Sequence, residues 1–278
     1  MNFFQRLFPN YSTVLLLTVY IFSVFWFVLL DKSSEEISQS NYFYTLLEGI
    51  IPIWGGLYGL FLAKKWGGFS SIIGKSQSLI SLGLISWGIG SLIFVGYYNL
   101  LMHIEVPYPS FADVAYIVSW PLWGMGMVYL SRATGVKAAL HNRWSKYWII
   151  ILPVFVVGFS YYFLVHVARA GIISSSDDFI KVFFDLAYPV GDVVILTLAT
   201  IIYGLSFKYF AGKYRWAIYF LLFGFFVNYF ADFFFSYQTT LETFVPGGLT
   251  DFLFVTAMFA ISFGVNSLDS RVVANQNV

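Results

Sequence analysis

The chain contains no cysteine, few charged residues and only three histidines among its 278 residues. The absence of cysteine excludes disulfides, thiolate metal sites and cysteine nucleophiles. Charged residues make up 10% of the sequence, whereas a soluble domain carries about 25%. Hydrophobic residues make up 59%, and so few charges cannot keep that much apolar surface in water. The composition therefore predicts a membrane protein.

Short motifs typical of enzymes and cofactor proteins are also missing. The sequence has no nucleophile elbow, phosphate-binding loop, dinucleotide fingerprint or zinc-protease motif. His103-Ile104-Glu105 has the look of a local metal site, but this spacing does not supply a full ligand set, so no metal is predicted. The net charge is +1 with no basic block, so we expect no nucleic-acid partner. No catalytic residue is predicted, and the cofactor stays unknown.

Long apolar stretches dominate the chain instead. A membrane-spanning helix needs about 20 mostly apolar residues, and runs this long lack the alternation of a β-barrel. We therefore predict an all-α integral membrane protein that forms a single transmembrane domain over residues 1–278. The first stretch is interpreted as a retained span rather than a signal peptide, since no small-residue cleavage site follows it. The eight predicted spans are residues 12–30, 43–63, 77–98, 111–131, 147–168, 183–206, 215–236 and 249–268.

Basic residues are distributed unevenly between the two sides of these spans. The odd-numbered connections carry only Lys32, Arg169 and Lys181. Because cytoplasmic loops are enriched in Lys and Arg, both termini are expected in the cytoplasm, with the lipid bilayer around the spans. The termini and even-numbered connections carry the other twelve: Arg6, Lys64, Lys65, Lys75, Arg132, Lys137, Arg143, Lys146, Lys208, Lys213, Arg215 and Arg271.

An internal repeat is indicated by acidic residues near the starts of the even-numbered spans. These are Glu48, Asp113, Asp192 and Asp251, and a glycine follows each after eleven to thirteen residues. Since the repeating unit contains two spans, we predict four helical hairpins of the same orientation. If the acidic side chains face inward, this arrangement brings them to one membrane level.

Two interpretations of Asp113, Asp192, Asp251 and Glu48 stay open. Acidic residues within membrane spans usually face the protein interior, which favours a polar ligand-binding pocket near the outer leaflet. The alternative is helix capping, because a carboxylate is favourable at a helix N-terminus. Ser110-x-x-Asp113 resembles a capping box. Thr250 before Asp251 resembles an N-cap with an acidic first turn.

Asp232 differs from these residues because it lies inside an aromatic-rich span rather than at a helix start. Aligning Gly83 with Gly224 places Ser91 opposite Asp232 in the odd-numbered spans. Capping does not explain Asp232, so it is the leading candidate for a ligand-binding residue. Asn228, one helical turn earlier, is its expected neighbour.

Two prolines lie within predicted spans. Pro52 is followed by Gly55-Gly56, and Pro121 by Gly124. Because proline removes a backbone hydrogen bond, we expect kinks that interrupt the second and fourth spans.

The segment around Asp113 carries a family resemblance. Pro109-Ser110-Phe111-Ala112-Asp113-Val114-Ala115-Tyr116, followed by Trp120-Pro121-Leu122 and Gly124, resembles the "PS-x-AD-x-x-Y … YPL-x-x-G" pattern of an uncharacterised membrane-sensor region. That region precedes GGDEF-type diguanylate cyclases and some membrane histidine kinases. Ser86-Trp87-Gly88, Tyr188-Pro189 with Asp192, and Ala231-Asp232 are similar to its other spans. The resemblance implies a sensory, ligand-responsive membrane module, here without a catalytic output domain.

These observations lead to one expected function and three alternatives. We expect a stand-alone ligand-sensing or ligand-binding module of a prokaryotic inner membrane, whose acidic pocket opens towards the outer side. A separate signalling protein at the cytoplasmic loops is the expected partner. The alternatives are a small-solute or cation/proton-coupled transporter, a structural or assembly subunit, and an intramembrane lipid-modifying enzyme.

Overall fold

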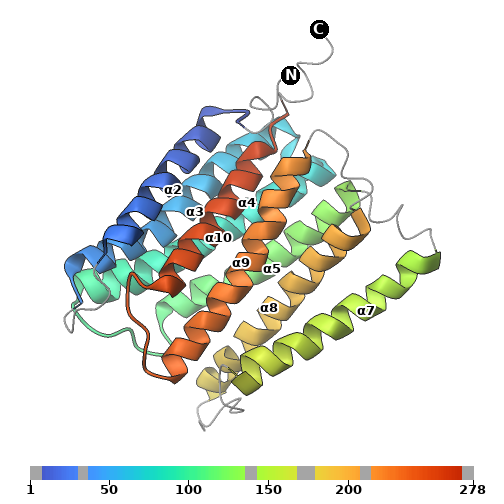
Figure 1. Ribbon diagram of the computed structural model, residues 1–278. Coiled ribbons are helices and arrows are strands. Elements are labelled where there is room, and N and C mark those ends of the chain that lie inside the picture. Colours follow the sequence, from blue (N-terminus) through green and yellow to red (C-terminus); the bar gives the residue numbers. More distant parts are fainter. Residues whose placement is uncertain (1–7, 31–36, 135–142, 168–178, 207–213, 271–278) are drawn as a thin grey trace.

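The computed structural model describes residues 8–30, 37–134, 143–167, 179–206 and 214–270, and every regular element in these ranges is helical (Figure 1). Two α-helices continue directly into π-helical segments, which the sequence did not predict. The elements are α2 (Tyr11–Leu29), α3 (Gln39–Lys65), η1 (Gly68–Ser70), α4 (Ile72–Ser91) with η2 (Leu92–Leu101), α5 (Phe111–Ala133), α7 (Arg143–Ser160) with η3 (Tyr161–Val167), α8 (Phe179–Ser206), α9 (Arg215–Thr240) and α10 (Leu249–Ser267).

The lengths and compositions of these helices confirm the prediction of a helical membrane protein. Six helices of the described part are long and apolar enough to cross a membrane: Tyr11–Leu29, Gln39–Lys65, Ile72–Leu101, Phe111–Ala133, Arg215–Thr240 and Leu249–Ser267. The helices α7 and α8 contain shorter apolar segments, Ile150–Phe163 and Ala187–Ile202. Large apolar side chains remain on the outer surface, as lipid contact requires. Examples are Leu29, Phe111 and Phe179, which are 82%, 76% and 81% exposed.

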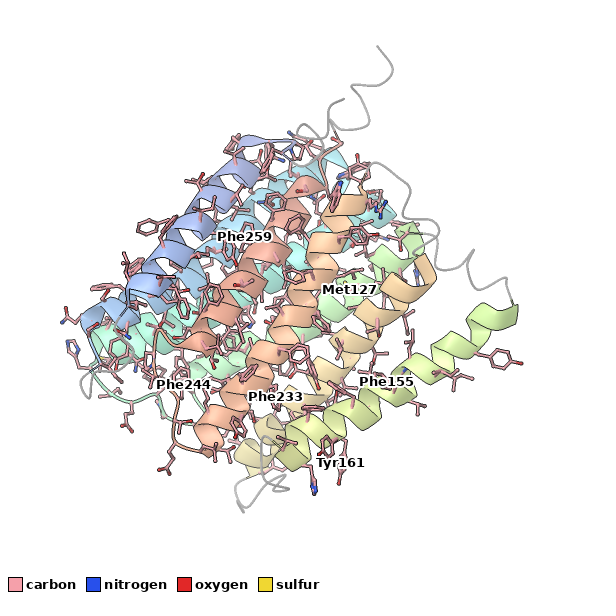
Figure 2. The ribbon with its side chains drawn as sticks, in the orientation of Figure 1. Met127, Phe155, Tyr161, Phe233, Phe244 and Phe259 are labelled. Carbon is pink, nitrogen blue, oxygen red and sulfur yellow. The ribbon has the colours of Figure 1, made fainter. Side chains whose placement is uncertain are left out.

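Six helices form a closed ring in the order α3, α4, α5, α8, α9 and α10, because each packs on the next and α10 packs on α3. The remaining two lie outside the ring (Figure 1). The helix α2 packs on α10 and α3, whereas α7 packs on α8 and its extension η3 packs on α9. Figure 2 shows Tyr161 at the outer edge of the bundle, while Met127 of α5 is fully buried.

Aromatic side chains fill the interior of the ring. Trp123 of α5 packs edge-on against Phe225 of α9, with ring centroids 5.4 Å apart, and its indole N–H donates to the carbonyl of Ile80 at 3.2 Å. Trp87 of α4 contacts Phe254 of α10 at 5.4 Å. Aromatic side chains thus make a large part of the described core.

Glycines bring α4 and α5 into close contact. A Cβ atom added at Gly126 would lie 3.1 Å from the backbone nitrogen of Ile80 and 3.2 Å from the carbonyl oxygen of Ser76. A Cβ atom at Gly83 would lie 3.1 Å from the carbonyl oxygen of Ser119. The two helix backbones approach so closely that these positions exclude larger side chains.

The helices α9 and α10 pack through the same pattern. A Cβ atom added at Gly264 would lie 2.8 Å from the backbone nitrogen of Leu221 and 2.8 Å from the carbonyl oxygen of Ala217. One at Gly224 would lie 3.0 Å from the carbonyl oxygen of Ala257. In the α4–α5 hairpin, Gly126 faces the residues three and seven positions before Gly83. In the α9–α10 hairpin, Gly264 likewise faces the residues three and seven positions before Gly224. The two hairpins therefore have matching interfaces.

The predicted capping box at Ser110 is present. Ser110 is the N-cap of α5, and its backbone N–H donates to Asp113 Oδ2 at 2.6 Å. Its hydroxyl also donates to that oxygen, at 2.8 Å. The side chain of Asp113 thus fixes the start of α5.

The predicted N-cap at Thr250 is wrong. Gly248 caps α10, so Thr250 lies in the first turn, and its hydroxyl donates to Gln238 Oε1 at 2.6 Å. Gly247 adopts a positive φ of 74°, which glycine tolerates and other residues rarely adopt. This turn starts the helix before Thr250, and Asp251 reaches back to accept the N–H of Gly247 at 2.6 Å.

Pro52 and Pro121 do not end the helices in which they lie, and the kinks expected there stay a prediction. Both prolines lie inside continuous helices, α3 and α5. A Cβ atom at Gly88 of α4 would lie 3.2 Å from Pro52 Cγ, so the absence of a side chain at Gly88 leaves space for the proline ring. Helix packing thus accommodates Pro52 without ending α3.

Candidate functional site

Glu48 and Asp251 form a carboxyl pair between α3 and α10. Glu48 is 5% exposed and Asp251 is 2% exposed, and their side chains are hydrogen-bonded to each other. Asp251 Oδ2 also accepts the hydroxyl of Thr45 at 2.9 Å and the N–H of Gly247 at 2.6 Å. Two carboxyl groups can hydrogen-bond to each other only when they share a proton, because an ionised carboxylate only accepts hydrogen bonds.

The loop before α10 is held in place by Asn41. Its side-chain amide donates to the carbonyl of Pro246 at 2.9 Å. A Cβ atom at Gly247 would lie within 3.2 Å of Asn41, so the loop packs directly on α3. This contact brings Asp251 to Glu48.

A second carboxyl pair joins α8 and α9. The side chains of Asp192 and Asp232 are hydrogen-bonded, and Asn228 Nδ2 donates to Asp232 Oδ2 at 2.7 Å. The predicted contact between Asn228 and Asp232 is therefore present. Asp192 is 5% exposed, whereas Asp232 is only partly buried. The same requirement for a shared proton applies to this pair.

Asp113 connects α5 to α8 in addition to capping α5. The hydroxyl of Tyr188 donates to Asp113 Oδ1 at 2.5 Å, while Oδ2 receives both bonds from Ser110. The ring of Tyr188 also packs edge-on against Trp120, with centroids 4.9 Å apart. Capping and interior contact, which the sequence left as alternatives, are both made by this one carboxylate.

Two tyrosines lie among these acidic groups. Tyr116 lies near Glu48, Asp113 and Asp232. Tyr188 lies near Asp113, Asp232 and Tyr116. The predicted acidic residues are thus gathered near one end of the ring, as two pairs linked through Asp113 and the two tyrosines. We call this set the carboxyl network: Glu48, Asp251, Asp113, Asp192, Asp232, Tyr116 and Tyr188.

Three buried polar atoms beside these carboxyls lack a hydrogen-bond partner in the described chain. They are the hydroxyl of Tyr44, Glu48 Oε1 and Asn228 Oδ1. Each residue is at least 95% buried. A buried polar group without a partner costs about 1–3 kcal/mol, so such atoms are rarely left unpaired unless they bind water or a ligand. Both carboxyl pairs therefore retain unused hydrogen-bonding capacity.

Sequence analysis missed the tyrosines of this site. Tyr44 and Tyr188 stand four residues before Glu48 and Asp192, respectively. Residues four apart lie on the same helix face, so this repeated spacing was a usable signal. Tyr116 has no comparable signal, because only the packing of α5 against its neighbours brings it between the acids.

No metal-binding cluster forms in the described residues. No three His, Asp or Glu side chains in these ranges come together in a way that could hold a metal ion. His103 and His166 are both exposed, and they lie on separate elements.

Comparisons with known proteins do not assign a family. No family model, no curated protein and no solved structure matches the chain.

A second polar network lies at the opposite end of α10. Asn10, before α2, donates to the carbonyl of Asn266 at 2.7 Å and to Asp269 Oδ2 at 3.3 Å. Gln77 of α4 donates to the carbonyl of Leu268 at 3.1 Å. These bonds tie the end of α10 to the helices around it. We call them the terminal network.

Tyr214 extends the terminal network to α9. Its hydroxyl donates to the carbonyl of Asp269 at 3.1 Å. Burial, followed by the nearby charge of Asp269, raises the pKa of Tyr214 above its ordinary value. The start of α9 is thereby linked to the end of α10.

Tyr188→Phe tests the link between α5 and α8. The substitution removes the hydroxyl that Asp113 accepts, so we expect the free energy of unfolding to fall by about 1–2 kcal/mol. Equilibrium unfolding in mixed micelles, followed by circular dichroism, measures the change. Tyr237→Phe is the control, because Tyr237 is 38% exposed, and it should have no effect. Equal stabilities of the two variants would show that the Tyr188 hydroxyl does not stabilise the fold.

Proposed function

We propose that this chain is a ligand-sensing module of the membrane, and that its carboxyl network is the responsive site. The ligand is a proton or a small molecule with a cationic group. The observation that carries the proposal is the position of α10. Its first turn supplies Asp251 to the carboxyl network, and its last residues belong to the terminal network. A change in the position of α10 at the carboxyl network would therefore also move its other end, in the terminal network.

The chemistry of the carboxyl pairs supports such a response. We infer that each pair holds a proton between its two acidic groups. Loss of that proton would place two negative charges side by side in a region of low dielectric, where like charges repel strongly. A cationic group that replaces the proton would remove the repulsion. Proton exchange or ligand binding would thus alter the contact between α3 and α10, and that between α8 and α9.

Asp232 is the most accessible carboxyl of this network. It is partly exposed, whereas Glu48, Asp192 and Asp251 are each at least 95% buried. The unpaired Oδ1 of Asn228 lies beside it. We propose that a ligand reaches the network at Asp232, which keeps this residue as the leading binding candidate.

The proposed topology places all eight helices across the bilayer of a prokaryotic inner membrane, with both termini cytoplasmic. The distribution of Lys and Arg supports this orientation. The chain before α2 and the end of α10 meet in the terminal network, which puts them on one side. With this orientation, the carboxyl network lies towards the outer side.

We also propose that the bundle is built from repeated hairpins. The matching glycine contacts of the α4–α5 and α9–α10 hairpins support this idea. Equivalence of the other two hairpins, α2–α3 and α7–α8, rests on the spacing of Glu48 and Asp192 from Tyr44 and Tyr188. The repeat would explain why acidic residues recur at one level.

Signalling through a separate protein is part of the proposal. The resemblance to a membrane-sensor region found before diguanylate cyclases and histidine kinases favours this role. Under the proposed topology, the terminal network and the basic loops face the cytoplasm, where such a protein would bind. A perturbation of α10 would reach that surface through Asn266 and Leu268.

Transport is the second candidate, since buried carboxyls also carry protons and cations in transporters. The partial exposure of Asp232 is the observation that favours it. The terminal network argues against it, because its hydrogen bonds close the ring at the other end of α10. A structural or assembly role would not require the carboxyl network to respond to protons or to a ligand.

A single engineered cysteine can test sensing, because the chain contains no other cysteine. Ser70 is exposed in η1, close to Trp66, whose indole N–H donates to the carbonyl of Leu268 at 2.9 Å. A fluorophore on Ser70→Cys in proteoliposomes should change its emission when the external pH is varied. Glu48→Gln should abolish the change, since the glutamine amide donates permanently to Asp251 and no longer needs a proton.

The exposed Glu105 supplies the matched control, and Glu105→Gln should leave the fluorescence response intact. An unchanged response in Glu48→Gln and Asp192→Asn would contradict the proposal. Luminal pH is recorded in the same vesicles. Net proton flux that depends on Asp232 would establish transport in place of sensing.

A further inference from the structure

An apolar groove runs along the outer surface between α5 and α8. Its volume is about 870 Å³, which lies within the range of roughly 300–1,000 Å³ typical of ligand sites. Its walls are almost entirely apolar, with Val190 and Val194 on α8 and Met125 on α5 about half exposed. The groove therefore suits hydrocarbon rather than a polar solute.

One end of this groove is basic. Arg132, in the last turn of α5, lines it together with Tyr129. The guanidinium of Arg132 lies 5.3 Å from the centroid of the Tyr129 ring, and Lys75 Nζ lies 5.5 Å from the same centroid. In the described residues, these cations contact an aromatic ring rather than a carboxylate. Their charges are thus free to meet an anion at the mouth of the groove.

In the proposed repeat, α10 and α3 correspond to α5 and α8, and a helix covers the outer surface between α10 and α3. There, α2 packs on both neighbours, and Tyr20 stacks on Phe259 with ring centroids 4.2 Å apart. The two interfaces share one pair of positions. Ser262 donates to the carbonyl of Ile51 in one, and Gly124 faces Ile195 in the other.

The helix α7 takes a different position from α2. It packs on α8, and the hydroxyl of Tyr229 on α9 is hydrogen-bonded to Ser160 at 3.0 Å. Val156 joins Leu196 and Tyr229 in a small apolar cluster. These contacts hold α7 towards α9, on the far side of α8 from the groove.

We propose that the groove between α5 and α8 binds an anionic phospholipid. The acyl chains lie along the apolar walls, and the phosphate is held by Arg132 and Lys75. Basic residues at a membrane surface attract anionic lipids, and long basic side chains reach the headgroup level readily. The inference depends on the membrane location of the chain and not on the proposed sensing role.

A phosphatidylglycerol that carries a photoreactive group in its acyl chain tests the site on the purified protein. Mass spectrometry should locate the crosslinks in α5 and α8, around Met125 and Val194. Titration of the delipidated protein with phosphatidylglycerol, read by native mass spectrometry, measures affinity. Arg132→Gln and Lys75→Gln should each weaken binding about fivefold, whereas phosphatidylcholine binding should not change.

Two matched controls accompany these variants. Lys64→Gln removes an exposed charge from the last turn of α3, at the same end of the bundle, and should leave phosphatidylglycerol affinity unchanged. Val194→Trp fills the groove and should reduce crosslinking there, whereas Phe223→Trp on α9 should not. Equal affinity for phosphatidylglycerol and phosphatidylcholine in every variant would overturn the proposal, because nonspecific binding of lipid around the protein would explain that result. Crosslinking of groove residues to a polypeptide in place of lipid would also overturn it.

Discussion

Asp251→Ala is expected to lower the free energy of unfolding by roughly 2–6 kcal/mol, because it leaves two buried groups, each worth about 1–3 kcal/mol, without a partner. The N–H of Gly247 loses its acceptor, and the carboxyl of Glu48 loses its hydrogen-bonded neighbour. Thr45 is less affected, since its hydroxyl is also within reach of the carbonyl of Asn41 at 3.0 Å. Detergent-titrated unfolding followed by circular dichroism measures the loss.

Asp251→Asn separates the role of the charge from that of the hydrogen bonds. Its side-chain oxygen can accept from Gly247, and its amide can donate to Glu48, so we expect a loss below about 1 kcal/mol. Glu105→Ala removes an exposed acid and should change stability by no more than about 0.5 kcal/mol. If Asp251→Ala were as stable as Glu105→Ala, the pair with Glu48 would not contribute to the fold.

Gly264→Ala is expected to lower the free energy of unfolding by about 2 kcal/mol. Its methyl group would lie 2.8 Å from backbone atoms of Ala217 and Leu221, which cannot move unless α9 and α10 separate. Overpacking of this kind costs about 1–3 kcal/mol, and the better helix propensity of alanine returns at most about 1 kcal/mol. The same unfolding titration provides the measurement.

Gly126→Ala and Gly158→Ala complete this series. At Gly126 the nearest backbone atoms are 3.1 and 3.2 Å from the added Cβ, so a smaller loss is expected. At Gly158 nothing lies within 4 Å, and stability should be unchanged or slightly higher. A loss at Gly158 equal to that at Gly264 would mean that intrinsic glycine effects, and not helix contact, determine the result.

Local sequence signals were reliable where the physics is local. The Ser110 capping box needs only a serine and an acid three residues apart, and it is present as predicted. The contact between Asn228 and Asp232 requires only one helical turn. The prediction at Thr250 failed because a glycine with positive φ, Gly247, changes where the chain enters α10.

Non-local contacts could not be predicted in this way. Asp113 and Tyr188 are 75 residues apart, and their contact exists because α5 and α8 are neighbours in the ring. The surroundings of Pro52 are non-local for a related reason, since a glycine on another helix leaves space for the proline ring. No spacing within a single helix encodes either contact.

The sequence by itself determined that the protein is helical and membrane-embedded. A chain with 10% charged and 59% hydrophobic residues, arranged in long apolar stretches, must satisfy its backbone hydrogen bonds within helices. It also identified the buried acids as the unusual residues. Only the tertiary structure decided that Glu48 pairs with Asp251 and that Asp192 pairs with Asp232. Partner choice follows from which helices pack together, and that depends on close contacts between distant parts of the chain, such as those made by Gly224 and Gly264.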